Sequence, residues 1–142
     1  MSSAASETLA RELQRLECRM SLRILVADDD ADLLEVVVEA LTDAGANVAS
    51  AKSGAELLKR LGEDGAFDLI IADVLMPWMT GLQVASSVRE AGLEVPVILM
   101  TGTRDSTLAE RVDSLDRTVL LRKPFGDREL RAAVQKLLPG AI

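Results

Sequence analysis

The stretch from Asp68 to Gly81, "DLIIADVLMPWMTG", decides the fold class, because an apolar run closes on a single carboxylate. Consecutive apolar positions are typical of a strand that is covered on both faces of a parallel sheet. Asp73 ends this run, and an ionised carboxylate buried without a partner is strongly destabilising. We therefore expect Asp73 to lie where a buried strand opens into a site that neutralises its charge.

The same pattern recurs along the chain, where five short apolar runs alternate with five longer amphipathic stretches. This alternation predicts an α/β protein with a parallel sheet covered by helices. The predicted strands are 22–27, 46–50, 68–73, 95–100 and 118–121. The predicted helices are 30–44, 53–62, 82–92, 105–115 and 126–138.

Helix-end signals accompany these stretches. Ser53 and Asp105 are predicted N-caps, because their side chains can accept a hydrogen bond from the first helical turn. Gly45, Gly62 and Gly92 are expected just past the ends of three helices, where a left-handed residue is common.

Composition excludes several classes of function. The net charge of −7 over 142 residues argues against a nucleic-acid surface or an anionic membrane as the main partner. There is no histidine, so the chemistry must use carboxylates, hydroxyls and lysine. The single cysteine, Cys18, cannot form an intramolecular disulfide, and the chain shows no signal segment or membrane-length apolar run. These features predict a cytoplasmic protein.

Residues 1–20 differ from the rest and predict an N-terminal amphipathic helical extension, with the remaining domain at 21–142. Leu9, Leu13, Leu16 and Met20 recur at helical spacing, with charged residues between them. A homodimer through residues 5–20 is one interpretation. A helix docked on the domain and a frayed tail are the alternatives.

The predicted strand ends carry the residues with chemical function. In an open parallel sheet, ligands bind at the carboxyl ends of the strands, beside the point where strand order reverses. These ends carry Asp28 and Asp29, Asp73, Thr101 with Gly102, and Lys123 followed by Pro124. Three clustered carboxylates repel one another unless a cation neutralises them, and an all-oxygen ligand set of this kind suits Mg²⁺. A hydroxyl and an ammonium group beside that metal could bind phosphoryl oxygens, with Asp73 as the nucleophile.

Four segments, "ILVADDDADLL", "DLIIADVLMPWMTG", "VILMTGT" and "LLRKPF", together resemble the receiver domains of two-component response regulators. The resemblance covers roughly residues 22–138, in the expected order. It implies a flavodoxin-like, doubly wound, five-stranded sheet with strand order 2-1-3-4-5.

The resemblance also implies roles for individual residues. Asp73 would accept a phosphoryl group from a histidine kinase or phosphotransfer protein. Asp29, Asp73 and the backbone carbonyl of Leu75 would bind Mg²⁺, with Asp28 acting mostly through water. Thr101 and Lys123 would contact the phosphoryl oxygens.

By this resemblance the protein is a regulator that signals by binding another protein, rather than an enzyme with a separate substrate. Only "PGAI" follows the last predicted helix, which favours a single-domain regulator of the chemotaxis-receiver kind. Leu120 stands where family members often carry the aromatic residue that reports phosphorylation.

Two alternatives stay open at this stage. The spacing of Asp28 and Asp30 also suits a Mg²⁺-dependent phosphohydrolase with an aspartyl nucleophile. The missing aromatic at Leu120 is compatible with a receiver-fold binding module that does not signal by phosphorylation.

Overall fold

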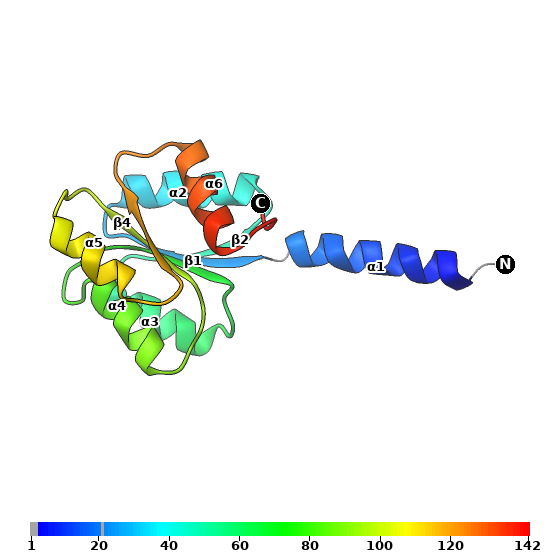
Figure 1. Ribbon diagram of the computed structural model, residues 1–142, viewed down its shortest axis with the longest axis horizontal. Coiled ribbons are helices and arrows are strands. Elements are labelled where there is room, and N and C mark those ends of the chain that lie inside the picture. The colour runs from blue at the N-terminus through cyan, green and yellow to red at the C-terminus, as the bar shows by residue number, and fades with distance from the viewer. Residues whose placement is uncertain (1–2, 21) are drawn as a thin grey trace.

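A parallel sheet of five strands, covered by helices on both faces, forms the body of the protein (Figure 1). The computed structural model describes the backbone of residues 3–20 and 22–142, and the side chains of 5–13 and 22–142. The strands are β1 (Arg23–Ala27), β2 (Asn47–Ala51), β3 (Leu69–Asp73), β4 (Val97–Thr101) and β5 (Thr118–Arg122). The helices are α1 (Ser3–Met20), α2 (Ala31–Asp43), α3 (Gly54–Glu63), α4 (Gly81–Glu90), α5 (Ser106–Asp113) and α6 (Asp127–Leu137).

Strand order in the sheet is β2-β1-β3-β4-β5, as the resemblance implied. Alternate residues of β1 face opposite sides: Ile24 and Val26 pack with α2 and α6, whereas Leu25 and Ala27 pack with α3, α4 and α5. Because both faces are buried, each central strand is apolar over four consecutive positions, with a polar residue only at one end. This explains the continuous apolar runs in the sequence.

Strand and helix positions agree closely with the sequence-based predictions for the body of the protein. Ser53 caps α3 and Asp105 caps α5, each accepting a hydrogen bond from a backbone N–H of the first turn. Gly45 and Gly92 have positive φ angles, of 97° and 79°, just past α2 and α4. The prediction for Gly62 was wrong, since α3 continues through it to Glu63.

The described residues form six helices, against the five expected for the fold, and the sixth lies in the segment that was predicted separately as a helical extension. The additional helix is α1, which points away from the sheet and covers neither of its faces (Figure 1). Leu9 and Leu13 of the expected stripe are exposed, whereas the side chains of Leu16 and Met20 lie outside the described residues. Within the described part of the chain, no helix combines the length and apolar character needed to cross a membrane.

Sheet register brings the acidic strand ends together. Ala27 of β1 pairs with Ala72 of β3, so the next residues, Asp28 and Asp73, leave adjacent strands at the same level. Gly81 at the start of α4 then passes so close to the end of β3 that a Cβ atom there would clash with the backbone carbonyl of Asp73. The close approach fixes where the loop after Asp73 returns to the sheet.

We predict that Gly81→Ala destabilises the protein by about 1–3 kcal/mol, because the new methyl group must push the end of β3 or the start of α4 aside. Urea denaturation of the variant and the wild type measures this change. Gly62→Ala is the matched control, since Gly62 lies in helix α3 with no atom near an added Cβ. It should stabilise the protein by about 0.5–1 kcal/mol through helix propensity, and an equal loss in both variants would contradict the proposed clash.

Candidate functional site

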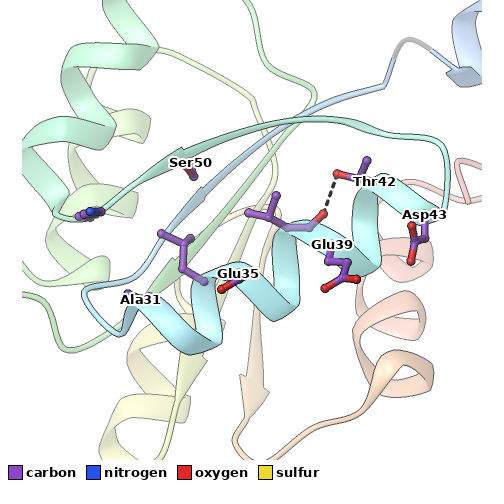
Figure 2. Close-up of a pocket in the computed structure, with 9 residues that line it drawn as sticks. Ala31, Glu35, Glu39, Thr42, Asp43 and Ser50 are labelled. Carbon is purple, nitrogen blue, oxygen red and sulfur yellow. Dashed lines mark hydrogen bonds between the residues drawn. The ribbon is translucent and has the colours of Figure 1, made fainter.

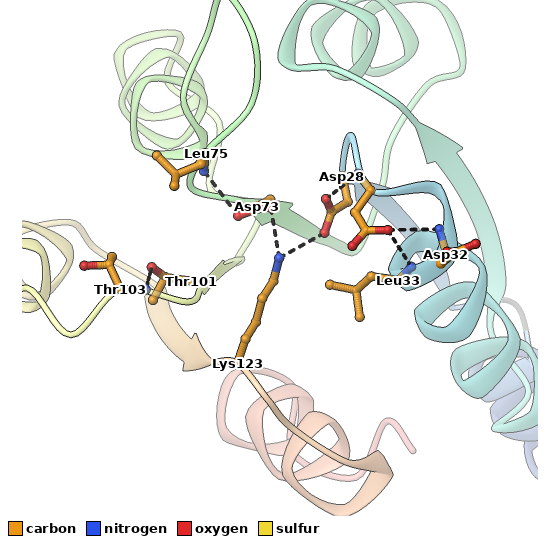
Figure 3. Close-up of polar contacts among 9 residues, drawn as sticks. Asp28, Asp32, Leu33, Asp73, Leu75, Thr101, Thr103 and Lys123 are labelled. Atoms are coloured by element: carbon orange, nitrogen blue, oxygen red, sulfur yellow. Dashed lines mark hydrogen bonds and ion pairs between the residues drawn. The ribbon is translucent and has the colours of Figure 1, made fainter.

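The ammonium group of Lys123 lies between two buried carboxylates at the carboxyl edge of the sheet (Figure 3). Its Nζ donates to Asp73 Oδ2 at 2.9 Å and to Asp28 Oδ2 at 3.3 Å. Asp28 is 0% exposed and Asp73 is 7% exposed. The structure therefore gives Asp73 the partner that its place at the end of a buried strand requires.

Asp29 completes a cluster of three carboxylates with Asp28 and Asp73, although its own side chain is exposed. One oxygen from each of the three lies within 4.8 Å of the other two. A compact all-oxygen set with one exposed member fits Mg²⁺, which prefers carboxylate oxygens and retains several waters. Asp28, Asp29 and Asp73 are thus the residues that could hold this metal.

Burial raises the pKa of Asp28 from its ordinary 3.8 to about 6, and the charge of Asp73 adds to this effect. The backbone N–H of Asp30 and the ammonium group of Lys123 act in the opposite direction and only partly compensate. For Lys123, burial by itself lowers the pKa. The hydrogen bond and charge of Asp73, with the charge of Asp28, outweigh burial and raise the Lys123 pKa above 10.5. Lys123 is therefore charged, and one cation serves two carboxylates.

Three strand ends share one local geometry that orients their side chains. Asp28 Oδ1, Asp73 Oδ1 and Thr101 Oγ1 each accept a hydrogen bond from the backbone N–H two residues further along the chain. The three donors are Asp30, Leu75 and Thr103, at 2.9, 3.2 and 3.0 Å. Short polar side chains often form such turns where regular structure ends. Each turn holds its side chain at the carboxyl edge of the sheet.

Backbone pairing sets the position of Lys123. The residue follows β5, and its N–H donates to the carbonyl of Thr101 at 2.7 Å. Arg122 adds a second link, from its side chain to the carbonyl of Thr103 at 3.2 Å. The ends of β4 and β5 are thus held together, and the lysine side chain reaches across β4 towards β3 and β1 (Figure 3).

The structure brings some of the expected residues into direct contact and leaves others apart. Lys123 contacts both Asp28 and Asp73. Thr101 is buried at the neighbouring strand end, where its hydroxyl accepts the N–H of Thr103. Leu75 contacts Asp73 through its backbone N–H, which donates to the carboxylate. The expected metal contact concerns the backbone carbonyl of Leu75 and stays a prediction.

Asp30 does not join the carboxylate cluster. It caps α2, where its side chain accepts the backbone N–H groups of Asp32 and Leu33. The phosphohydrolase alternative needs Asp28 and Asp30 to work as a pair in the site. The exposed capping position of Asp30 gives that alternative no support.

Two large apolar side chains stand exposed on the loop that follows Asp73. Leu75 is 67% exposed and Trp78 is 99% exposed. Trp78 also has a positive φ angle of 71°, which is unusual for a bulky residue. The sequence predicts a loop here, but Pro77 and Gly81 by themselves do not indicate that these two side chains are exposed.

A groove of about 510 Å³ between α2 and the edge strand β2 lies outside this cluster (Figure 2). Glu35, Glu39 and Asp43 line it, together with Lys52. The hydroxyl of Thr42, in the same groove, donates to the carbonyl of Val38 at 2.7 Å. The proton of this hydroxyl is therefore used in a hydrogen bond within the helix. The carboxylate cluster remains the better candidate for a functional site.

Comparison with known families gives a consistent result. The family model for the response regulator receiver domain matches residues 24–135. Among solved structures, the chemotaxis response regulator CheY4 of Vibrio cholerae is similar with a TM-score of 0.75 and 29% sequence identity. That similarity covers 82% of this chain and 98% of the CheY4 chain.

Curated relatives differ in how much of their length the match spans. Response regulator MprA of Mycobacterium ulcerans is 39% identical over 121 residues, which are 84% of this chain and 51% of the relative. The chain therefore spans about half the length of that protein. The response regulator receiver protein CpdR of Brucella abortus is 34% identical over 119 residues, which are 84% of this chain and 98% of CpdR.

We predict that Asp28→Asn raises the melting temperature of the metal-free protein at pH 7–8 by about 3–6 °C, since one ammonium then serves a single carboxylate. Wild-type Asp28 binds its proton more tightly in the folded state, with a pKa of about 6, than at its ordinary 3.8. Stability of the wild type should therefore fall as the pH rises from about 4 to about 6. The difference in melting temperature between Asp28→Asn and the wild type should grow as the pH rises over that interval and be absent below about pH 4. Thermal unfolding followed by circular dichroism, with chelator present, measures it.

The exposed capping residue supplies the control. Asp30→Asn should leave the melting temperature nearly unchanged, because asparagine caps a helix as well as aspartate does. An advantage of Asp28→Asn that does not vary with pH would contradict the role assigned to the buried charge.

Proposed function

The chain belongs to the response regulator receiver domain family, and from this premise we propose that it accepts a phosphoryl group on Asp73 from a histidine kinase or a phosphotransfer protein. The observation that carries the proposal is the Lys123 ammonium group shared by two buried carboxylates, Asp28 and Asp73. A structural ion pair would need only one carboxylate. The second carboxylate, with Asp29 beside it, adds electrostatic repulsion that destabilises the fold. Such clusters of like charges are typical of functional sites, where a bound cation can neutralise them.

In the proposed reaction, a carboxylate oxygen of Asp73 attacks the phosphorus of the donor's phosphohistidine. The new P–O bond forms an acyl phosphate, while the P–N bond breaks and its electron pair returns to the imidazole. Lys123 already donates to Asp73 Oδ2, so its ammonium group is close enough to stabilise negative charge on the transferred group. The hydroxyl of Thr101, buried at the adjacent strand end, can donate a hydrogen bond to another phosphoryl oxygen.

Asp28, Asp29 and Asp73, with the backbone carbonyl of Leu75, are the residues that we propose would hold Mg²⁺ here. When bound, the metal would offset the repulsion between the carboxylates and the incoming phosphoryl oxygens. Asp28 and Asp29 would be left unmodified by the reaction. Their role is to hold the cation beside Asp73.

We further propose that phosphorylation changes the surface that a protein partner recognises, so that the chain is a phosphoacceptor and not an enzyme with a separate substrate. Leu120 is half-buried and packs against the cluster formed with α3, α4 and α5. We propose that a change in the packing of Leu120 transmits phosphorylation to the protein surface, in place of the aromatic residue that family members often carry at this position. We place this exchange in the cytoplasm, in keeping with the single cysteine. Residues 1–20 would be an extension of a receiver domain at 21–142.

Asp73→Asn should abolish phosphorylation by a small phosphodonor such as acetyl phosphate in the presence of Mg²⁺, because an amide is a poor nucleophile. Intact-protein mass spectrometry, which detects the gain of one phosphoryl group, is the measurement. Asp30→Asn is the matched control and should be phosphorylated like the wild type, since Asp30 caps α2. Loss of phosphorylation in Asp30→Asn with retention in Asp73→Asn would favour the hydrolase alternative and reject the receiver assignment.

We expect slow loss of the phosphoryl group, because the exposed Leu75 offers no donor or acceptor to orient an attacking water. Leu75→Asn should therefore shorten the half-life of the phosphorylated protein by about 3-fold or more, which is a small part of what a positioned general acid or base contributes. Decay of purified phosphoprotein in Mg²⁺, followed by Phos-tag electrophoresis, measures this rate. Leu93→Asn makes the same change at an exposed leucine in the α4–β4 loop and should not alter the half-life. An unchanged or longer half-life in Leu75→Asn would show that another group controls the water.

A further inference from the structure

Among the described side chains, helix α1 exposes the first two leucines of the apolar stripe. It runs for 18 residues away from the sheet (Figure 1), and Leu9 and Leu13 are 61% and 51% exposed. Leucines at helical spacing that stay this exposed are typical of a helix that buries one face against another chain. The receiver fold and its site do not require this helix.

The sequence register of α1 is that of a short coiled coil. Leu9, Leu13, Leu16 and Met20 are separated by four, three and four residues, which is the alternation of core positions in a heptad repeat. An antiparallel pair centred between residues 14 and 15 uses the whole stripe. Leu13 then lies opposite Leu16 of a second copy, and Leu9 lies opposite Met20.

Charge selects the antiparallel arrangement over the parallel one. Beside the core of a parallel pair, Glu12 would face Glu17 of the second copy, and this repulsion would occur twice. In the antiparallel pair, Glu12 flanks Arg19 of the second copy, and this attraction occurs twice. A carboxylate accepts several hydrogen bonds, so the pairing holds whatever else Glu12 contacts within its own helix.

Net charge outside the helix favours the same arrangement. Residues 1–20 contain three Glu and three Arg, so the whole net charge of −7 lies on residues 21–142. A parallel pair would place two acidic domains side by side at one end. An antiparallel pair places them at opposite ends of a helix that is about 27 Å long, beyond the screening length of about 8 Å at physiological salt.

We propose that the partner of α1 is a second copy of this chain, joined through an antiparallel α1–α1 coiled coil that carries one receiver domain at each end. The pairing involves neither the carboxylate cluster nor phosphorylation, so it stands independently of the proposed function. An interface between two helices of this length is smaller than the roughly 1,600 Å² of a standard protein–protein contact. We therefore expect a dissociation constant on the order of 10–100 µM.

Sedimentation velocity of the full chain, at concentrations from about 5 to about 500 µM, tests the dimer across its expected dissociation constant. The wild type should change from monomer to dimer over this range. Leu13→Ala should weaken the dimer at least about 30-fold, because it removes a core side chain in both copies while keeping high helix propensity. Arg11→Ala is the matched control on the outer face of α1 and should leave the dissociation constant unchanged.

Two outcomes would overturn the dimer. One is a wild type that stays monomeric at all concentrations, in which case another protein or the chain's own domain must cover the stripe. The other is an equal effect of Arg11→Ala and Leu13→Ala. Thermal unfolding of each variant confirms that the receiver domain is intact, since neither substitution touches the sheet.

Reversal of a single charge tests the orientation. Glu12→Arg should weaken an antiparallel dimer about 4-fold at low salt, because Arg then faces Arg19 of the second copy. The same change would strengthen a parallel dimer, because Arg would face Glu17. The double variant Glu12→Arg with Arg19→Glu should restore the wild-type dissociation constant. A tighter or unchanged dimer in Glu12→Arg would overturn the antiparallel arrangement.

Discussion

The shared ammonium group of Lys123 is the interaction on which the carboxyl edge of the sheet depends. Two carboxylates, Asp28 and Asp73, leave adjacent strands at the same level and are almost fully buried. Without a cation between them, repulsion and desolvation would oppose the close packing of β1 and β3. The charge of Lys123 reduces this unfavourable free energy but does not cancel it, since the pKa of Asp28 is still raised. The edge is consequently stable enough to fold and still suited to an additional cation.

Rigid backbone contacts hold this charged edge in place. The side chains at the ends of β1, β3 and β4 each accept an N–H from two residues further on. Gly81 lets the loop after Asp73 return close to the strand. The loop itself presents Leu75 and Trp78 to solvent, so any protein that reaches Asp73 meets apolar side chains beside the carboxylates. This combination of a charged centre and an exposed apolar rim fits the approach of a protein donor in the phosphoryl transfer that we propose.

A second feature, α1, is separate from that centre. It covers neither face of the sheet, and its leucines Leu9 and Leu13 are exposed, which is why we propose that it acts through contacts with a second copy of the chain. In the antiparallel pair proposed above, the two acidic domains lie far apart. Each carboxylate edge then remains open, and association through α1 does not compete with the proposed phosphoryl transfer.

By itself, the sequence was enough to predict the α/β class, the positions of the strands and most helix ends, because apolar periodicity and capping residues are local signals. It also identified Asp28, Asp29, Asp73, Thr101 and Lys123 as strand-end residues. Only the tertiary structure decided how these side chains meet: Lys123 bridges Asp28 and Asp73, Asp30 caps a helix, and Gly81 packs on the Asp73 carbonyl. Helix α3 likewise runs through Gly62, against the local signal for its end. Such contacts join residues up to 95 positions apart, and no local pattern specifies which of several charged groups will share a buried partner.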